Sequence, residues 1–226
     1  MGKSRDRYIA ALKYPWLTSL YDPLIGLTMR DTSFKRRLAT QARIRGGQRV
    51  LDLGCGTVTL TLLIKRMHPN AEVVGLDGDP RVIRIAQAKM SKARLSVALN
   101  LGMAFDLPYP DGSFDHVFSS LVFHHLTRMD KERTFQEVSR VLRPGGGLHI
   151  ADFGKPSNPL MYMVSQVVRR LEPVSDNIQG ILPALIQAAG FEEVTESARC
   201  MTPFGTLSFY QAKKPSGSGG SRRHRW

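Results

Sequence analysis

Strand-like and helix-like segments alternate through the middle of this 226-residue sequence, and that alternation limits the folds open to the chain. The short strand-like runs lie at 49–53, 72–76, 95–101, 114–120 and 147–153. Segments with apolar residues at helical spacing lie between them, at 59–67, 81–93 and 131–142. Strands separated by helices of this length pair in parallel and are covered on both faces. The pattern therefore predicts an α/β fold with a Rossmann-like, mostly parallel sheet.

The later part of the sequence departs from this alternation. Residues 158–174 and 180–191 are expected to be helical, the second helix ending at Gly190. Two strand-like runs follow at 191–200 and 202–214. They are expected to pair as an antiparallel hairpin that closes a seven-stranded sheet.

Both ends of the chain differ in composition from the expected domain, which covers 46–213. Residues 1–45 mix basic and apolar residues with two prolines, which predicts an N-terminal lid of two or three helices. Residues 214–226 combine a Gly/Ser stretch with basic residues and predict a flexible basic tail. No apolar run is long enough to span a bilayer, and the first residues lack the apolar core of a secretory signal. We therefore expect a cytoplasmic protein.

The formal net charge of +13 is compatible with acidic binding partners. Part of this charge belongs to the tail, but the rest of the chain is also basic. Nucleic acid, anionic lipid and phosphorylated small molecules are all compatible with it, and so is a merely soluble basic surface. The two cysteines, Cys55 and Cys200, make neither a disulfide framework nor a metal site, so no metal is expected.

The stretch VLDLGCGTVT, residues 50–59, predicts a ligand-binding loop after the first strand. Gly54 and Gly56 allow positive φ and a close approach of backbone N–H groups to a ligand. Asp77 ends the second strand 21 residues after Gly56, where a carboxylate can accept both hydroxyls of a ribose. The dinucleotide fingerprint needs a third glycine where this chain has Thr59. A nucleoside with an amino-acid tail therefore fits the loop better than a pyrophosphate.

Four motifs in this order and spacing carry a family resemblance: VLDLGCGT, GLDGDP, LPYPDGSFDHVFSS and VSRVLRPGGGLHIADF. They resemble class I S-adenosylmethionine-dependent methyltransferases. The most similar branch is that of ubiquinone and menaquinone biosynthesis methyltransferases (methyltransferase type 11), together with bacterial phospholipid N-methyltransferases. The resemblance covers roughly residues 46–153 and, more loosely, the terminal hairpin. It implies S-adenosylmethionine as the cofactor.

By position, the resemblance also implies which residues hold that cofactor. The first loop would hold its methionine end, the end of the second strand its ribose, the segment after the third strand its adenine, and the end of the fourth strand its amino-acid portion. In chain order these residues are Asp52, Gly54, Gly56 and Thr57, then Asp77 and Gly78, then Met103 and Ala104, and finally Ser120. Residues 143–147 would form the turn into the fifth strand.

Two residues depart from the family pattern. Val58 stands where the family usually has glycine, and a β-branched residue at positive φ is an outlier. We therefore predict helical φ at Val58 with the loop intact. Met103 replaces the acidic or amide residue that binds the adenine amino group, and it can only pack against the ring. The lost hydrogen bond costs about 1 kcal/mol.

The candidate catalytic residues are His124 and His125, just after the fourth strand, and Tyr21 in the expected lid. Methyl transfer from a sulfonium is an in-line displacement that depends mainly on alignment and exclusion of water. A base is needed where the acceptor is a hydroxyl, an ammonium or an acidic carbon. One histidine could instead hydrogen-bond the backbone at a helix start, and Tyr21 and Asp22 could merely form a turn before Pro23. Both interpretations stay open.

The acceptor is expected to be a small lipophilic or aromatic molecule, such as a phospholipid amine or a quinone precursor. The sequence SSLVF after the fourth strand lacks the Asn/Asp-Pro-Pro-aromatic signature of base-amine methyltransferases, and two distant cysteines do not suit arsenic methylation. Apolar and basic residues mix in the lid and in 158–174, as in segments that lie at an anionic membrane surface. Ordinary amphipathic helices docked on their own domain have the same composition.

Two other functions remain as alternatives to a small-molecule methyltransferase. One is a cofactor-binding protein without catalysis, in which Val58 and Met103 would be signs of decay. The other is an RNA-directed methyltransferase or nucleic-acid-binding module, which only the charge supports. We expect no specific nucleic-acid partner, and the sequence carries no signal for an oligomeric state.

Overall fold

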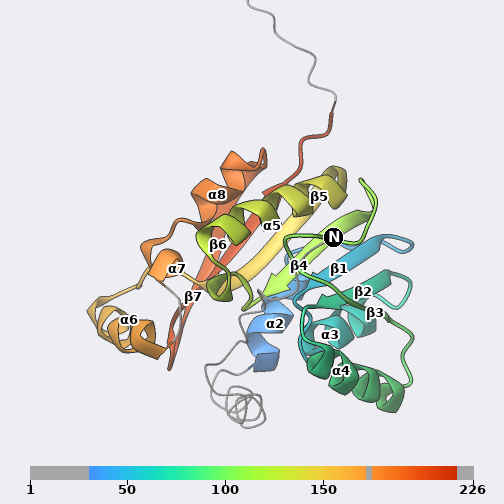
Figure 1. Cartoon of the computed structure of the whole chain (residues 1–226), viewed down its shortest axis with the longest axis horizontal. Helices are drawn as coiled ribbons and strands as arrows, with labels where there is room; N and C mark the ends of the chain where they lie inside the picture. Colours follow the sequence, from blue (N-terminus) through green and yellow to red (C-terminus); the bar gives the residue numbers. More distant parts are fainter. Residues whose placement is uncertain (1–30, 172–174, 218–226) are drawn as a thin grey trace, which may run out of the picture.

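A seven-stranded sheet forms the centre of the chain, of which a computed structural model describes residues 31–171 and 175–217 (Figure 1). The strand order is β3-β2-β1-β4-β5-β7-β6. The strands are β1 (Arg49–Leu53), β2 (Glu72–Asp77), β3 (Ala98–Leu101), β4 (Phe114–Ser120), β5 (Leu142–Phe153), β6 (Glu192–Thr202) and β7 (Gly205–Lys213). The first five are parallel, and β7 runs antiparallel to both β5 and β6. The predicted mostly parallel sheet with a C-terminal hairpin is confirmed.

The strand order reverses between β1 and β4, at the middle of the sheet. β1 pairs in parallel with β2 on one side and with β4 on the other, so the connections that leave β1 and β4 diverge at their carboxyl ends. In open α/β sheets, ligands bind at such a reversal, outside the carboxyl ends of the strands. The topology therefore places the glycine loop after β1 where a ligand site is expected.

Helices cover both faces of this sheet (Figure 1). Val50 and Leu51 are neighbours in β1 whose side chains belong to different apolar clusters, because successive strand residues face opposite ways. The cluster of Val50 includes side chains of α2 (Asp31–Thr40) and α3 (Thr59–Met67). The cluster of Leu51 includes side chains of α5 (Arg128–Val141) and α8 (Leu182–Ala188). Helix α4 (Pro80–Ala93) packs beside β2 and β3.

The described part of the expected lid is α2, which contributes to the core of the sheet. Phe34 and Leu38 of this helix are buried in the same cluster as Phe118 and Phe209. The rest of the expected lid, including Tyr21, lies outside the described residues, as does 218–226 of the expected tail. Among the described helices, none is long and apolar enough to cross a membrane.

One expected turn is in fact part of a strand. Residues 143–147 were predicted to turn into the fifth strand, but β5 begins at Leu142 and its pairing with β4 shifts register between Phe114 and His116. Gly145 has φ 76°, and its N–H donates to the carbonyl of Lys214 at 2.9 Å. The glycines therefore form an irregular strand start that is held by the chain leaving β7.

Three helices follow β5 where two were expected, at 158–174 and 180–191. Helix α6 (Pro159–Leu171) is followed by the short α7 (Ser175–Gln179), and α8 then ends near Gly190, which has φ 86° as its predicted role as helix terminator requires. These helices connect β5 to the hairpin, and α7 lies against the loop after β4.

Candidate active site

The glycine loop after β1 is fixed between the ends of β2 and β4. Gly54 has φ 69°, and the N–H groups of Gly54 and Cys55 donate to the carbonyl of Leu76 at 2.8 and 2.9 Å. A Cβ on Gly54 would lie 2.3 Å from Cγ2 of Val122, so this position requires glycine both for its backbone conformation and for space. At Gly56, which has φ 52°, a Cβ would meet nothing within 4 Å. The loop is therefore held tightly on its inner side and open at Gly56.

Asp77 lies next to this loop, as its predicted role requires. Its Oδ2 accepts a hydrogen bond from the N–H of Gly56 at 3.0 Å, and its Oδ1 accepts one from the N–H of Asp79 at 3.0 Å. Burial raises the pKa of Asp77, although these bonds and the neighbouring Gly78 N–H act in the opposite direction. Because an ionised carboxylate has about four acceptor sites, Asp77 keeps acceptor capacity for the ribose beyond its bonds to the backbone.

Asp52 is buried beneath the loop with one oxygen unpaired. Thr61 of α3 donates its hydroxyl to Oδ2 at 2.5 Å, while Oδ1 has no hydrogen-bond partner among residues 31–171 and 175–217. Burial raises the pKa of this carboxyl group to about 6. A buried acceptor that lacks a partner favours a bound cationic or hydrogen-bond-donating group.

Ser120 provides a second buried oxygen without a partner at the neighbouring strand end. Its Oγ is buried at the end of β4 and makes no hydrogen bond within the described protein, whereas Ser119 donates to the carbonyl of Leu53 at 3.1 Å. β1 and β4 are adjacent, so the unpaired oxygens of Asp52 and Ser120 belong to neighbouring strands at the reversal of strand order. Polar groups of this kind suit the ammonium and carboxylate end of an amino-acid-like ligand.

The prediction of helical φ at Val58 is wrong. Its φ of 62° and ψ of 23° are left-handed, at the residue that caps α3. The side chain is fully buried in a cluster with Cys55 and with Ile83, Ala86 and Met90 of α4. A non-glycine residue in a rare backbone region costs about 1–3 kcal/mol, so burial of the isopropyl group must offset that cost. The loop thus keeps the backbone form that a glycine would give it.

Met103 and Ala104 lie in the loop after β3, next to the end of β2. The N–H of Gly102 donates to the carbonyl of Asp77 at 3.0 Å, and Met103 forms an isolated antiparallel bridge with Asp106. Both predicted adenine residues are half-buried, and Ala104 packs against the cluster of α5 and α8. The structure therefore brings this segment beside Asp77.

The two candidate histidines form a short 3-10 helix, η2 (Phe123–His125), directly after β4. His124 is 1% exposed, and its Nδ1 lies 2.8 Å from Oδ1 of Asp152 at the end of β5. The rings of His124 and His125 are 3.9 Å apart between centroids. Burial, together with the neighbouring His124, lowers the pKa of His125 to about 3. His125 is therefore neutral at physiological pH, and His124 is too deeply buried to be the more accessible of the pair.

Asp152 organises this corner and was not identified from the sequence. Its Oδ2 accepts hydrogen bonds from the N–H groups of Val122 and Phe123, and its Oδ1 accepts from the N–H of Phe153 and the amide of Asn177 in addition to its contact with His124. Burial alone would raise its pKa, but His124 and these donors hold the pKa below its ordinary value. An ionised Asp152 requires a proton on Nδ1 of His124, which leaves Nε2 as the acceptor when the ring is neutral.

Helix α7 supplies two further buried contacts that the sequence did not predict. The amide of Asn177 donates to Asp152 at 3.0 Å, and the fully buried ammonium of Lys131 on α5 lies 3.2 Å from the carboxylate of Asp176. These contacts join α5, α7 and η2. The sequence signal for them, the polar run SDN at 175–177, lies between the two stretches expected to be helical, 158–174 and 180–191, and no prediction covers it.

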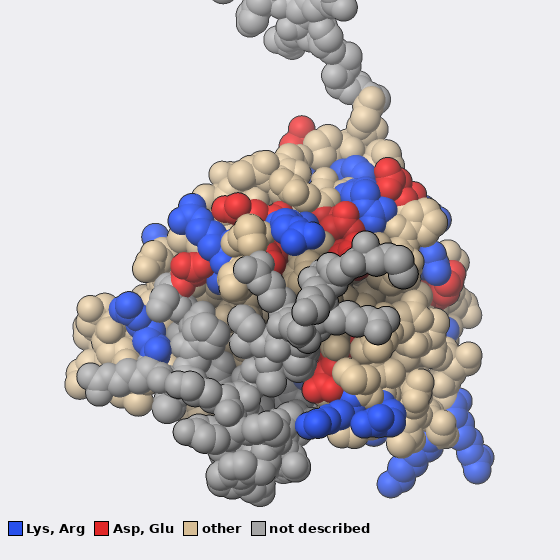
Figure 2. All heavy atoms as spheres, in the orientation of Figure 1, with Lys and Arg blue, Asp and Glu red and all other residues tan. Residues whose placement is uncertain are grey.

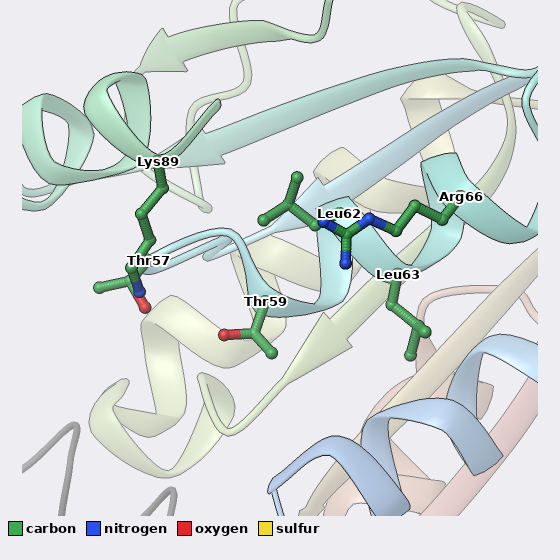
Figure 3. Close-up of a pocket in the computed structure, with 6 residues that line it drawn as sticks. All are labelled: Thr57, Thr59, Leu62, Leu63, Arg66 and Lys89. Carbon is green, nitrogen blue, oxygen red and sulfur yellow. The ribbon is translucent and has the colours of Figure 1, made fainter. Parts of the chain in front are cut away.

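A surface hollow of about 260 Å³ lies beside the loop rather than at the strand ends (Figure 3). Its walls come from the loop, α3 and α4, and consist of Thr57, Thr59, Leu62, Leu63, Arg66 and Lys89. Of the predicted cofactor residues only Thr57 lines it, so the ligand site is defined by the strand ends and not by this hollow. Within the described ranges, no group of three His, Cys, Asp or Glu side chains could hold a metal ion.

Comparison with known proteins gives concordant results. A family model described as a methyltransferase domain matches residues 50–146. The demethylmenaquinone methyltransferase of Thermus thermophilus is 36% identical over 137 residues, which are 61% of this chain and 61% of that protein, so the chain spans less than two thirds of that relative. An uncharacterized methyltransferase of Synechocystis, sll0829, is 31% identical over 89% of this chain and 92% of its own length.

Solved structures agree at the level of the fold. The crystal structure of the YcgJ protein from Bacillus subtilis is 17% identical and superposes with a TM-score of 0.65, over 82% of this chain and 100% of that one. A sequence identity of 17% supports similarity of fold and nothing further. The overall fold is therefore a feature that this chain shares with a known structure.

Proposed function

The chain belongs to the class I S-adenosylmethionine-dependent methyltransferases of the menaquinone and ubiquinone branch, and on this premise we propose that it methylates a small lipophilic or aromatic acceptor of the quinone-precursor type. The observation that carries the proposal is the group of polar atoms at the strand reversal. Asp77 lies 3.0 Å from the N–H of Gly56, and the adjacent Asp52 and Ser120 each keep a buried oxygen without a partner.

These residues fit S-adenosylmethionine in three places. Asp77, with Gly78 beside it, has acceptor capacity for the ribose hydroxyls. Asp52 and Ser120 offer unpaired oxygens to the methionine end, next to the open side of Gly56. Met103 and Ala104 provide an apolar, half-buried surface for the adenine ring. The three places follow the carboxyl edge of the sheet from β1 and β4 to β3.

The methyl transfer depends mainly on alignment of the acceptor with the methyl group of the cofactor. When bound, S-adenosylmethionine supplies a methyl group on a sulfonium, and this carbon bonds to the acceptor while the carbon–sulfur bond breaks and its electrons stay on a neutral thioether. The chain's part is to hold the acceptor in line and to exclude water, and this effect alone can supply much of the rate. The glycine loop between β2 and β4 helps to hold this alignment, because its backbone at Gly54 packs so closely on Val122 that a Cβ there would overlap the valine side chain.

We assign the removal of the acceptor proton to His125. Burial and the neighbouring His124 lower its pKa to about 3, so the ring is neutral at physiological pH and is a weak base. A base this weak can take a proton only from an acceptor that becomes strongly acidic as the methyl group is added. His124 stands behind His125 as a positioning residue, because its Nδ1 is tied to the ionised Asp152 and its ring contacts that of His125. The carboxylate of Asp152, which contacts His124, would also stabilise positive charge that develops on the neighbouring His125.

The acceptor class rests on the relatives. The Thermus protein is named for demethylmenaquinone, an acceptor that is both aromatic and lipophilic. Phospholipid amines are the second acceptor type compatible with a lipophilic site. Neither alternative function, a cofactor-binding protein without catalysis or an RNA-directed enzyme, has a specific feature of the described residues in its favour.

Two measurements test this function. Isothermal titration with S-adenosylmethionine and with its demethylated product should show binding of both, and transfer of a radiolabelled methyl group into demethylmenaquinone should exceed transfer into phosphatidylethanolamine. His125→Gln should retain cofactor binding and lose most of the transfer. Binding without transfer to any acceptor would favour the non-catalytic alternative, whereas the absence of binding would refute the cofactor site.

A further inference from the structure

Helix α6 has two apolar faces, of which only one is buried. Met161 and Val168 are buried on the inner face, where Val168 packs with Phe153 of β5. Leu160, Met163 and Val167 are 63%, 69% and 61% exposed. Their spacing of three and four residues places them in one stripe on the outer face of the helix. A helix docked on its own domain needs only the inner face, so the outer stripe calls for a separate explanation.

This stripe is the centre of a larger apolar surface. Met201 of β6 is 63% exposed with its sulfur 3.1 Å from the side-chain amide of Asn158, just before α6. We call Leu160, Met163, Val167 and Met201 the α6 patch. The large apolar side chains that are exposed elsewhere in the described ranges are only Ile85, Leu101 and Met129, together with Tyr162, which lies on another side of α6. Exposed apolar residues that gather in this way mark an interaction surface rather than ordinary scatter.

The segment that carries most of the patch has charges of one sign. Residues 154–171 contain Lys155, Arg169 and Arg170 and no acidic residue. Lys155 and Arg169 are exposed near the two ends of this segment, and Glu196 of β6 is close enough to Lys155 to interact with it electrostatically. Figure 1 places α6 at the edge of the molecule, and Figure 2 shows tan and blue atoms there. An apolar helix face bordered by cations is complementary to a surface that is oily inside and anionic outside.

We propose that the α6 patch binds an anionic membrane surface, with Leu160, Met163 and Val167 inserted among the lipids and the basic residues at the head groups. A second copy of the chain fits the patch less well, because a stable protein interface takes about 20–30 residues from each partner and the patch offers four. Two α6 helices facing each other would also bring their arginines together without an acidic residue of α6 to pair with.

The inner face of α6, opposite the patch, connects this helix to the proposed catalytic corner. Phe153 packs on Val168 of α6 and meets the ring of His124 edge-on, with 4.9 Å between ring centroids. This step rests on the proposed function: a lipophilic acceptor dissolved in a bilayer would reach the site from the side on which α6 lies. The membrane contact itself does not depend on that function.

The test is sedimentation of the full chain with vesicles of phosphatidylcholine that contain phosphatidylglycerol. The triple variant Leu160→Ser/Met163→Ser/Val167→Ser should bind at least about tenfold more weakly than the unchanged chain, because it removes three apolar side chains that would insert. The control Ile85→Ser/Met129→Ser removes apolar side chains elsewhere that are 50% and 51% exposed, and this variant should bind as the unchanged chain does. Arg169→Gln should weaken binding only when phosphatidylglycerol is present.

The outcomes separate the possible occupants. Unchanged vesicle binding by the triple variant overturns the proposal and assigns binding to the basic ends of the chain. Concentration-dependent self-association that the triple variant abolishes, without vesicle binding, overturns it in favour of a second copy. Titration with S-adenosylmethionine should be unaffected by the triple variant, which verifies its folding and keeps this test independent of the proposed function.

Discussion

The left-handed backbone of Val58 predicts an unusual ranking of two substitutions. Val58→Ala removes two buried methyl groups, which costs about 1.6 kcal/mol at about 0.8 kcal/mol per buried carbon group. Going on from alanine to glycine removes about another 0.8 kcal/mol of burial and about 0.5–1 kcal/mol through the entropy of the unfolded chain. At φ 62° the same step relieves left-handed strain of about 1–2 kcal/mol. The Ala and Gly variants should therefore differ in stability by no more than about 0.8 kcal/mol in either direction.

Val138 provides the control, because it is also fully buried but lies within the right-handed helix α5. There the glycine variant should be less stable than the alanine variant by about 1.5–2 kcal/mol, since it loses burial and helix propensity with no strain to relieve. Urea unfolding of the four variants measures both differences. Val58→Gly should also leave the affinity for S-adenosylmethionine unchanged in titration calorimetry, because the loop backbone already has the conformation that glycine prefers.

A single result would refute this reasoning. If Val58→Gly proved less stable than Val58→Ala by more than about 1 kcal/mol, as expected for Val138, position 58 would have a right-handed backbone after all. A large loss of cofactor affinity in a variant that remains folded would instead mean that the isopropyl group of Val58, and not the backbone, shapes the site.

Three further predictions concern the polar groups of the site. Asp77→Ala should weaken S-adenosylmethionine binding more than tenfold, about 1.4 kcal/mol, and an affinity equal to that of the unchanged chain would refute the ribose role. The pKa of Asp52 is raised from 3.8 to about 6, so the native state holds this proton more tightly than the unfolded state does. The free energy of unfolding should therefore fall as pH rises from about 4 to 6, by up to about 3 kcal/mol. Asp52→Asn should abolish that fall in urea titrations of the cofactor-free chain. Asn177→Ala should cost about 1.5–3 kcal/mol in the same assay, because it removes a hydrogen bond to the buried charge of Asp152, whereas Gln179→Ala at an exposed position of α7 should cost little.

The strands and helices could be predicted because their signals are local. Apolar periodicity gave α3 and β4 their bounds, Thr59–Met67 and Phe114–Ser120, without reference to the rest of the chain. The ligand-binding edge followed from topology, since a glycine loop after the first parallel strand must lie at the reversal of strand order. The contact between Gly56 and Asp77, 21 residues apart, followed from the same geometry.

The catalytic corner could not be predicted because its contacts are distant in sequence. Asp152 is 28 residues from His124 and 25 from Asn177, and nothing local distinguishes it from any acidic residue that ends a strand. Burial determines its importance, since a charge removed from water needs several donors and here obtains five. Burial of this kind is a property of the assembled sheet and of α7, and the sequence of neither segment shows it alone.

The wrong prediction at Val58 and a second left-handed residue, Leu121, have a common cause. Leu121 has φ 59° directly after β4, and its N–H donates to the carbonyl of Ala151 at 2.9 Å. The next residue, Val122, presses on Gly54, so both strained residues border the same glycine loop. Local preference would place each in a right-handed or extended conformation, and each is overruled by tertiary contacts. Strain that recurs on both sides of one loop is expected where a fold fixes a ligand site, and this recurrence supports the strand reversal as the place where the cofactor binds.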